Sequence, residues 1–507
     1  MSEIYNAWKP IRNYIKDVDP KAALETLRYY SLYSGTMDAT PPTPPAYIEV
    51  DNRILTARNT FLFPWDMEIL AREVILLSDQ QKTSYSHDIR KWRDFANLMN
   101  KLRYLENAIA RTELGEDNVL MELVRISHRQ FPFQTSVIGK EIIVRYGKLF
   151  TFDEMEPIVL RATGLPYRKI IDIGAMFWMK YEEFSGIEHP ATGMDGTDIS
   201  LEDIEIFLSL FSKPFDEMKE LIAESHQIDN TFLYQYSPIT AYPLIKFTVD
   251  GATSYVCSNV RRFTSQITKG VYYLLYKDRD FDNAFGNSFE RYVGDILEAS
   301  NTNAFELYSQ EVDPTQGKRR CDWIIDQESS FTMVECKTKR MAIGGYTIID
   351  DDEALLEQLD KLADAVVQTY EGYLVYRGQG YEPSVYPHGN TKDGSICVVT
   401  LENWYLYGNV ATYLDEIVIR KLLEKDINLS MIEEVPYEVM GSSTFEMLSF
   451  VANKGKNIRE LFIEHISSDE ADHEFGVFLN HHYKDELDDY DYVLADEMDN
   501  ILGTSLN

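Results

Sequence analysis

Two short segments near the middle of the chain carry residue types that can hydrolyse a phosphodiester bond. The first is 321–325 (CDWII) and the second is 331–337 (FTMVECK). Side chains alternate between the two faces of a β-strand, so Glu335 and Lys337 are predicted to point to the same face. A turn over 326–330 returns the chain and brings Asp322 beside Glu335. We therefore expect two carboxylates and one ammonium group to meet at one point.

This combination suits metal-assisted attack on phosphate. Mg²⁺ takes hard oxygen ligands from one or two carboxylates and keeps positions for water and a phosphate oxygen. It polarises the phosphate and lowers the pKa of bound water, while a nearby lysine stabilises developing charge or positions the water. We predict Asp322 and Glu335 as Mg²⁺ ligands, with Mn²⁺ as a substitute, and Lys337 as the third catalytic residue.

A further carboxylate, Glu290, stands upstream in the segment 285–294 (FGNSFERYVG). The apolar spacing predicts a helix from about 287 to 299, with Asn287 as its cap and Glu290 at the edge of the buried stripe. Gly294 lies one turn on and is expected to leave space beside the carboxylate. Glu290 is thus predicted to reach the metal directly or through water.

A second helix is predicted from about 353 to 373, where apolar residues recur at helical spacing. Its other face presents Gln358, Lys361 and Gln368. We assign Gln368 as the residue that orients the attacking water or a phosphate.

Together these residues resemble the PD-(D/E)xK nuclease superfamily, which has the restriction-endonuclease-like fold, over about residues 281–406. The resemblance implies that Asp322, Glu335 and the main chain of Cys336 bind Mg²⁺. It also implies that Lys337 serves the attacking water and that Glu290 is the helix acid. Cys321 stands where the family motif often has proline. The segment 285–293 is similar to uncharacterised bacterial defence-type nucleases.

Another E-x-K tripeptide, Glu217-Met218-Lys219, lies in a segment with helical spacing. Residues i and i+2 of a helix do not face each other, so this tripeptide is not predicted to be a site. For the 335–337 tripeptide one alternative remains open, in which the carboxylates and the lysine only pair across solvent-facing strands.

The charge balance limits the partners of the chain. Asp plus Glu number 83 and Lys plus Arg 49, which gives a net charge of -34. The whole molecule repels phosphate backbones, which argues against a non-specific DNA coat protein. Locally, a basic rim is expected to bind nucleic acid, with DNA favoured, and it comprises Lys318, Arg319, Arg320, Lys339 and Arg340. A partner or trigger is therefore expected to deliver the substrate.

The pattern of apolar and charged residues along the chain predicts three regions, and the predicted fold class is α+β. Residues 1–279 are predicted to be a mainly helical accessory or regulatory domain, with one helix from about 92 to 109 and another opened by a capping box at Ser200 and Asp203. Residues 280–430 are predicted to be the nuclease domain, of order αβββαββ around a mixed sheet, with the last two strands at 374–376 and 396–401. Residues 431–507 hold 18 acidic and 4 basic residues and are expected to pack on that domain or to compete with nucleic acid for the basic rim.

Other features exclude several classes of protein. The four cysteines form no C-x-x-C pair, which argues against a disulfide framework or a zinc knuckle and for a reducing cytoplasm. We find no signal peptide, no membrane-length apolar stretch and no phosphate loop. The sequence predicts a cytoplasmic endonuclease of antiviral defence or DNA processing, with a protein partner or a second copy bound by the helical region. The rival hypothesis is a non-catalytic regulatory or scaffolding protein.

Overall fold

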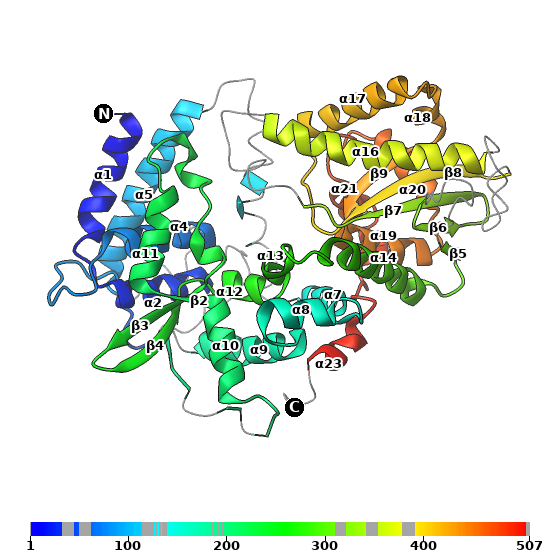
Figure 1. Ribbon diagram of the computed structural model, residues 1–507. Helices are drawn as coiled ribbons and strands as arrows, with labels where there is room; N and C mark the ends of the chain where they lie inside the picture. The colour runs from blue at the N-terminus through cyan, green and yellow to red at the C-terminus, as the bar shows by residue number, and fades with distance from the viewer. Residues whose placement is uncertain are drawn as a thin grey trace.

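The computed structural model of the chain is a mixed α/β protein with two mixed sheets (Figure 1). The structure describes residues 2–32, 45–49, 62–113, 126–127, 129–130, 133, 139–183, 186–190, 193–194, 196–309, 321–340, 353–377 and 391–502. Among these residues no helix has both the length and the apolar character needed to cross a membrane.

The first sheet lies among the helices of the N-terminal half. Its strand order is β1-β4-β3-β2, where β1 is Gly186–Glu188, β2 is Ser212–Pro214, β3 is Leu244–Val249 and β4 is Ala252–Cys257. The helices of this half are α1 (Glu3–Ile15), α2 (Pro20–Leu32), α4 (Pro64–Leu77), α5 (Trp92–Glu113), α7 (Lys140–Thr151), α8 (Glu156–Thr163), α9 (Tyr167–Glu183), α10 (Leu201–Phe211), α11 (Phe215–Ser225), α12 (Val260–Ile267) and α13 (Tyr272–Leu275). Short 3₁₀ helices are η2 (Asn230–Leu233), η3 (Pro238–Thr240) and η4 (Lys269–Val271).

Two sequence predictions for this half are confirmed. The helix expected from about 92 to 109 is α5, and the capping box at α10 is formed, with both Ser200 and Asp203 accepting from the main chain of the other. The first sheet is an addition to the mainly helical region that we predicted. Outside this sheet, Glu49 forms a single β-bridge with Lys91.

The second sheet builds the C-terminal half, and its strand order is β5-β6-β7-β8-β9. Its strands are β5 (Glu306–Ser309), β6 (Trp323–Asp326), β7 (Ser330–Lys337), β8 (Asp393–Thr400) and β9 (Tyr437–Gly441). The pairs β5·β6 and β6·β7 are antiparallel, and β7·β8 and β8·β9 are parallel. The helices are α14 (Phe281–Ser300), α16 (Glu353–Tyr376), α17 (Asn409–Glu424), α18 (Ser430–Glu434), α19 (Ser442–Asn453), α20 (Ile458–Ile466), α21 (Phe475–His482), α22 (Lys484–Leu487), η5 (Ala495–Glu497) and α23 (Met498–Ile501).

Helices cover both faces of this second sheet (Figure 1). On one face, Met333 and Val398 pack against α16 and α17. On the other, Val334 and Val399 join a core that includes α14, α19 and also α7 to α9. Burial on both faces explains the continuous apolar run at 396–399 in β8. The apolar core therefore crosses the boundary expected at residues 279 and 280.

Two local predictions are corrected. The segment 374–376 is the last turn of α16 and not a strand, because Tyr373 and Tyr376 continue the buried helical stripe. A short apolar run at the end of a helix cannot be told from a strand by periodicity. Helix α14 begins at Phe281, so Asn287 lies inside it and does not cap it; its side chain donates to Glu154 at 3.0 Å.

The acidic segment from residue 431 onward is integrated into the fold. It supplies β9 and helices α19 to α21, and Tyr492 and Ile501 are buried near its end. Strand β9 pairs with β8, and Phe445 and Leu448 of α19 join the core that holds Val334. Asp491 also pairs with Lys140 of α7 at 3.4 Å. The segment is therefore packed on the second sheet.

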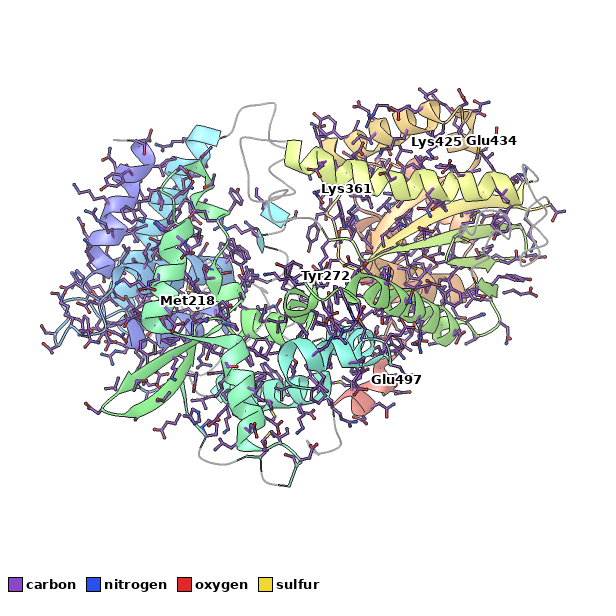
Figure 2. All side chains as sticks on the ribbon, viewed as in Figure 1. Met218, Tyr272, Lys361, Lys425, Glu434 and Glu497 are labelled. Atoms are coloured by element: carbon purple, nitrogen blue, oxygen red, sulfur yellow. The ribbon has the colours of Figure 1, made fainter. Side chains whose placement is uncertain are left out.

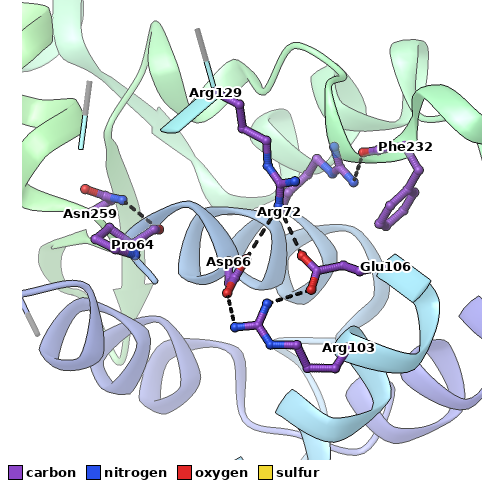
Figure 3. A network of polar contacts seen from close by, with 8 residues as sticks. All are labelled: Pro64, Asp66, Arg72, Arg103, Glu106, Arg129, Phe232 and Asn259. Carbon is purple, nitrogen blue, oxygen red and sulfur yellow. Dashed lines mark hydrogen bonds and ion pairs between the residues drawn. The ribbon is translucent and has the colours of Figure 1, made fainter. Parts of the chain in front are cut away.

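A buried network of charged side chains joins α4 to α5 in the N-terminal half (Figure 3). The Asp66 carboxylate is fully buried and accepts from Arg103 at 2.6 Å and Arg129 at 3.5 Å, and both arginines also bind Glu106. Burial, and after it the charge of Glu106, raises the pKa of Asp66 to about 7. The folded protein thus holds this proton more tightly than the unfolded chain, in which an aspartate titrates near about 3.9.

The raised pKa of Asp66 predicts a pH dependence of stability. Its favourable contribution is complete below about pH 4 and is lost as the pH rises to about 7, because ionisation costs more in the folded state. Asp66→Asn cannot ionise. We therefore expect the melting temperature of the variant minus that of wild type to increase as the pH rises from about 4 to about 7. Thermal melts of both proteins across this pH range test the prediction. Glu217→Gln, which changes an exposed side chain on α11, is the control. Parallel curves for Asp66→Asn and wild type would contradict the assignment.

Candidate active site

Strands β6 and β7 bring Asp322 and Glu335 side by side. The antiparallel register pairs Trp323 with Val334, which sets the preceding Asp322 opposite Glu335. The Asp322 main-chain N–H donates to the Val334 carbonyl at 3.0 Å, and its Oδ2 accepts from the Cys336 N–H at 2.7 Å. The second bond fixes the carboxylate against the neighbouring strand. The meeting of these groups that the sequence predicted is formed.

Glu335 and Lys337 share one face of β7, as their i, i+2 spacing predicts. The Lys337 Nζ donates to Glu335 Oε1 at 2.6 Å. The side chain of Glu335 is 6% exposed and that of Lys337 is 31% exposed, so the pair is not a fully hydrated surface contact. Val334 and Cys336 pack on the opposite face. The strand thus holds its polar pair on the α16 side and its apolar pair on the α14 side.

The two acids lack enough positive charge to stay ionised together. Burial, and after it the charge of Asp322, raises the pKa of Glu335 to about 7 even though Lys337 lies beside it. Burial disfavours the Lys337 ammonium, but the charge and hydrogen bond of Glu335 outweigh it and raise the pKa of Lys337. Lys337 is therefore a cation at neutral pH, and the carboxylate pair has room for one more positive charge.

Glu290 approaches this cluster from α14, and its surroundings differ from the prediction. Its charge also raises the pKa of Glu335, but less than burial and the charge of Asp322 do. The Glu290 main-chain carbonyl accepts from the Trp323 indole N–H at 3.0 Å. The space beside Gly294 is filled by Trp323, since a Cβ added at 294 would lie 2.3 Å from that ring. Gly294 serves helix–sheet packing and leaves no open space for a ligand.

Cys336 contributes its main chain to the cluster, because its N–H binds Asp322. Its thiol is a poor candidate for chemistry. Burial, and after it the charges of Asp322 and Glu335, raises the pKa of the Cys336 thiol well above its usual range. The thiol is neutral at physiological pH.

Lys339 lies near charged groups of both signs. It is exposed, and its pKa is lowered by desolvation and by the ammonium groups of Lys361 and Lys337, while the carboxylates of Asp364 and Glu357 oppose this shift. Lys361 lies on α16 (Figure 2), and it pairs with Glu357. The predicted rim residues Lys318, Arg319 and Arg320 lie outside the described residues.

Arg340 is not a rim residue in this arrangement. Its side chain is 8% exposed, and its guanidinium lies 3.4 Å from the Glu402 carboxylate and 4.1 Å from the centre of the Tyr272 ring. It also donates to the Lys269 carbonyl at 3.3 Å. The expected contact of Arg340 with nucleic acid is corrected for this reason: the group is buried and already paired.

Gln368 is likewise separate from the cluster. It is exposed on α16, ten residues and therefore about 15 Å along the helix from Gln358, which is buried. No hydrogen bond within the described part of the chain joins Gln368 to Asp322, Glu335 or Lys337. Lys361, also on α16, lies near Lys339, two residues beyond Lys337.

Glu402 and Tyr272 were not identified from the sequence as neighbours of this edge. Glu402 follows the end of β8, and it accepts from the Tyr146 hydroxyl at 2.8 Å as well as pairing with Arg340. The position of Glu402 directly after a predicted strand could have indicated this, because the carboxyl ends of adjacent parallel strands meet at one edge of a sheet. Tyr272 lies on a separate short helix, and no local pattern predicts its position.

Possible metal ligands occur only in small groups among the described residues. Within the described ranges, no group of three or more His, Cys, Asp or Glu side chains is placed to hold a metal ion. The pair Asp322 and Glu335 is smaller than such a group. A pair of carboxylates is nevertheless the usual protein contribution to a Mg²⁺ site, where waters and substrate phosphate supply the other ligands.

Comparisons with known proteins do not assign a family. No protein-family model, no curated protein and no solved structure matches the chain.

Proposed function

We propose that this chain is a Mg²⁺-dependent nuclease of the PD-(D/E)xK type that hydrolyses phosphodiester bonds in nucleic acid, with DNA favoured. One observation carries the proposal. Two adjacent buried carboxylates, Asp322 and Glu335, lie beside a protonated lysine at a strand end, and the pKa of Glu335 is raised to about 7. Buried acids with a strongly shifted pKa and a specific charge partner are typical of functional sites.

The side chains fit a hard divalent cation. Asp322 and Glu335 offer oxygen donors, and their shared charge is incompletely compensated by Lys337. These two carboxylates would hold Mg²⁺, or Mn²⁺ in its place, with Glu290 acting through water. When bound, the ion polarises the phosphate and acidifies its water.

Lys337 acts as a cation in this proposal. Its hydrogen bond to Glu335 fixes the ammonium group at the edge of the carboxylate pair. From there it donates to the attacking water or to a phosphate oxygen and stabilises the negative charge that develops during hydrolysis. Its raised pKa argues against a role as general base.

Lys339 and Lys361 provide the substrate side of the site. Lys339 lies near Lys337 and Lys361, with Asp364 and Glu357 also nearby, and its exposed ammonium group is available to a phosphate oxygen. The attraction is local, since the net charge of -34 repels a phosphate backbone at longer range. This contrast supports an enzyme that needs a partner or trigger to engage its substrate, as expected of antiviral defence.

A cleavage panel tests the proposed activity. We expect the purified chain to degrade at least one of plasmid DNA, single-stranded DNA and RNA with Mg²⁺ and none of them with EDTA. Calorimetric titration with MgCl₂ gives a second readout, and Asp322→Asn is expected to weaken binding of the metal. Cleavage that persists in EDTA, or equal Mg²⁺ affinity in wild type and variant, would overturn the metal assignment.

A further inference from the structure

Exposed tyrosine rings lie next to the edge of the second sheet. Tyr273 and Tyr276 are each 49% exposed, and Tyr272, the first residue of α13, is labelled beside this edge in Figure 2. Tyr273 packs edge-on against Tyr272, with ring centres 5.3 Å apart, and Tyr276 follows one helical turn after Tyr273. Tyr236 is 40% exposed and lies near Tyr273, whose hydroxyl contributes, after burial, to raising the pKa of Tyr236. Several open aromatic rings therefore lie at one place beside the strand that carries Lys337.

Arg340 connects these rings to the candidate active site. It follows Lys337 by three residues, so their Cα atoms are at most about 11 Å apart. Its guanidinium lies 4.1 Å from the Tyr272 ring centre and 5.5 Å from the Tyr273 ring centre. The buried contacts of Arg340 with Glu402 and Lys269 hold it there. The rings are therefore fixed with respect to the strand that carries Lys337.

We propose that Tyr273 and Tyr276 form a stacking platform for unpaired bases, which makes single-stranded nucleic acid the substrate class of the site. The inference rests on the proposed nuclease function. Bases stack on exposed aromatic rings in sequence-tolerant binding of single strands, and nearby cations strengthen the contact. The Lys277 ammonium, 5.6 Å from the Tyr276 ring, supplies such a cation, and the buried Arg340 holds the Tyr273 ring in place.

The charge of the chain favours stacking over electrostatic attraction. Acidic side chains offset the basic ones near α13, so little net positive charge remains there. One of these acids, Asp278, pairs with Arg161 at 2.8 Å. A duplex hides the faces of its bases and offers mainly its phosphates, which a chain of net charge -34 repels. A single strand carries phosphates as well, but stacking of its unpaired bases adds affinity that offsets this repulsion.

Binding measured without cleavage tests the platform. The full chain is titrated in EDTA against a fluorescent 20-mer of single-stranded DNA, the matching RNA and the matching duplex DNA. We expect Tyr273→Ala combined with Tyr276→Ala to weaken single-strand binding at least about tenfold and to leave duplex binding unchanged. The corresponding double Phe variant keeps the rings and should bind as wild type. The DNA and RNA arms identify which single strand is preferred.

Tyr104→Ala is the matched control, because Tyr104 is 62% exposed on α5, in the N-terminal half. Unchanged single-strand affinity in the double Ala variant, or an equal loss for the duplex, would overturn the platform. The two proposals fail separately. If binding depends on the two tyrosines but no Mg²⁺-dependent cleavage occurs, the nuclease proposal is rejected and the platform is kept. If cleavage occurs but binding does not depend on the tyrosines, the platform is rejected and the nuclease proposal is kept.

Discussion

Lys337→Ala is expected to lower the rate of Mg²⁺-dependent cleavage at least about 100-fold. The substitution removes the cation that Glu335 fixes at 2.6 Å, and with it the charge available to a phosphate oxygen or to the attacking water. Folding should be retained, since the Lys337 side chain is 31% exposed at the end of a strand whose apolar side chains stay in place. Initial cleavage rates and circular dichroism of the same preparation check both parts.

Glu217→Ala serves as the control for this prediction. Glu217 belongs to the other E-x-K tripeptide, is 57% exposed on α11 and pairs with Lys213 at 3.6 Å. Its loss should leave cleavage unchanged. Wild-type activity in Lys337→Ala, or loss of activity in Glu217→Ala alone, would show that the site lies elsewhere.

Much of the candidate site follows from strand periodicity. The alternation along β7 places Glu335 and Lys337 on one face, and a short turn is enough to return Asp322 to their side. Both are local consequences of chain geometry. The long apolar stripes of α5 and α16 are recognisable for the same reason, since a helical period repeated over several turns is difficult to mistake.

Long-range packing could not be predicted in this way. Arg340 looks like a surface cation in the sequence, but it is buried because Glu402 and Tyr272 come from distant segments to meet it. The acidic C-terminal segment was expected to pack on the preceding domain or to compete with nucleic acid, but nothing in its charge indicates that it adds strand β9 to the second sheet. Composition describes the exposed side of such a segment and does not reveal which partner its apolar side has.

The contact that joins the N-terminal helices to the second sheet predicts a large effect on stability. Arg145 of α7 binds Glu446 of α19 through both carboxylate oxygens, at 2.7 and 2.8 Å, and the side chains are 6% and 2% exposed. The Tyr292 hydroxyl donates to the same carboxylate at 2.6 Å. Glu446→Ala leaves the Arg145 guanidinium buried without its counter-ion. We expect it to lower the free energy of unfolding by about 3–5 kcal/mol.

The neighbouring pair on the same helix provides the control for this result. Lys148 binds Asp295 of α14 at 2.7 Å, but the two side chains are 17% and 33% exposed, so water compensates the loss of either partner. Lys148→Ala should cost less than about 1 kcal/mol. Replacing both buried charges, with Arg145→Met and Glu446→Leu, should restore part of the stability, because no unpaired charge is then buried. Equal urea midpoints for Glu446→Ala and Lys148→Ala would show that the buried pair does not hold the two halves together.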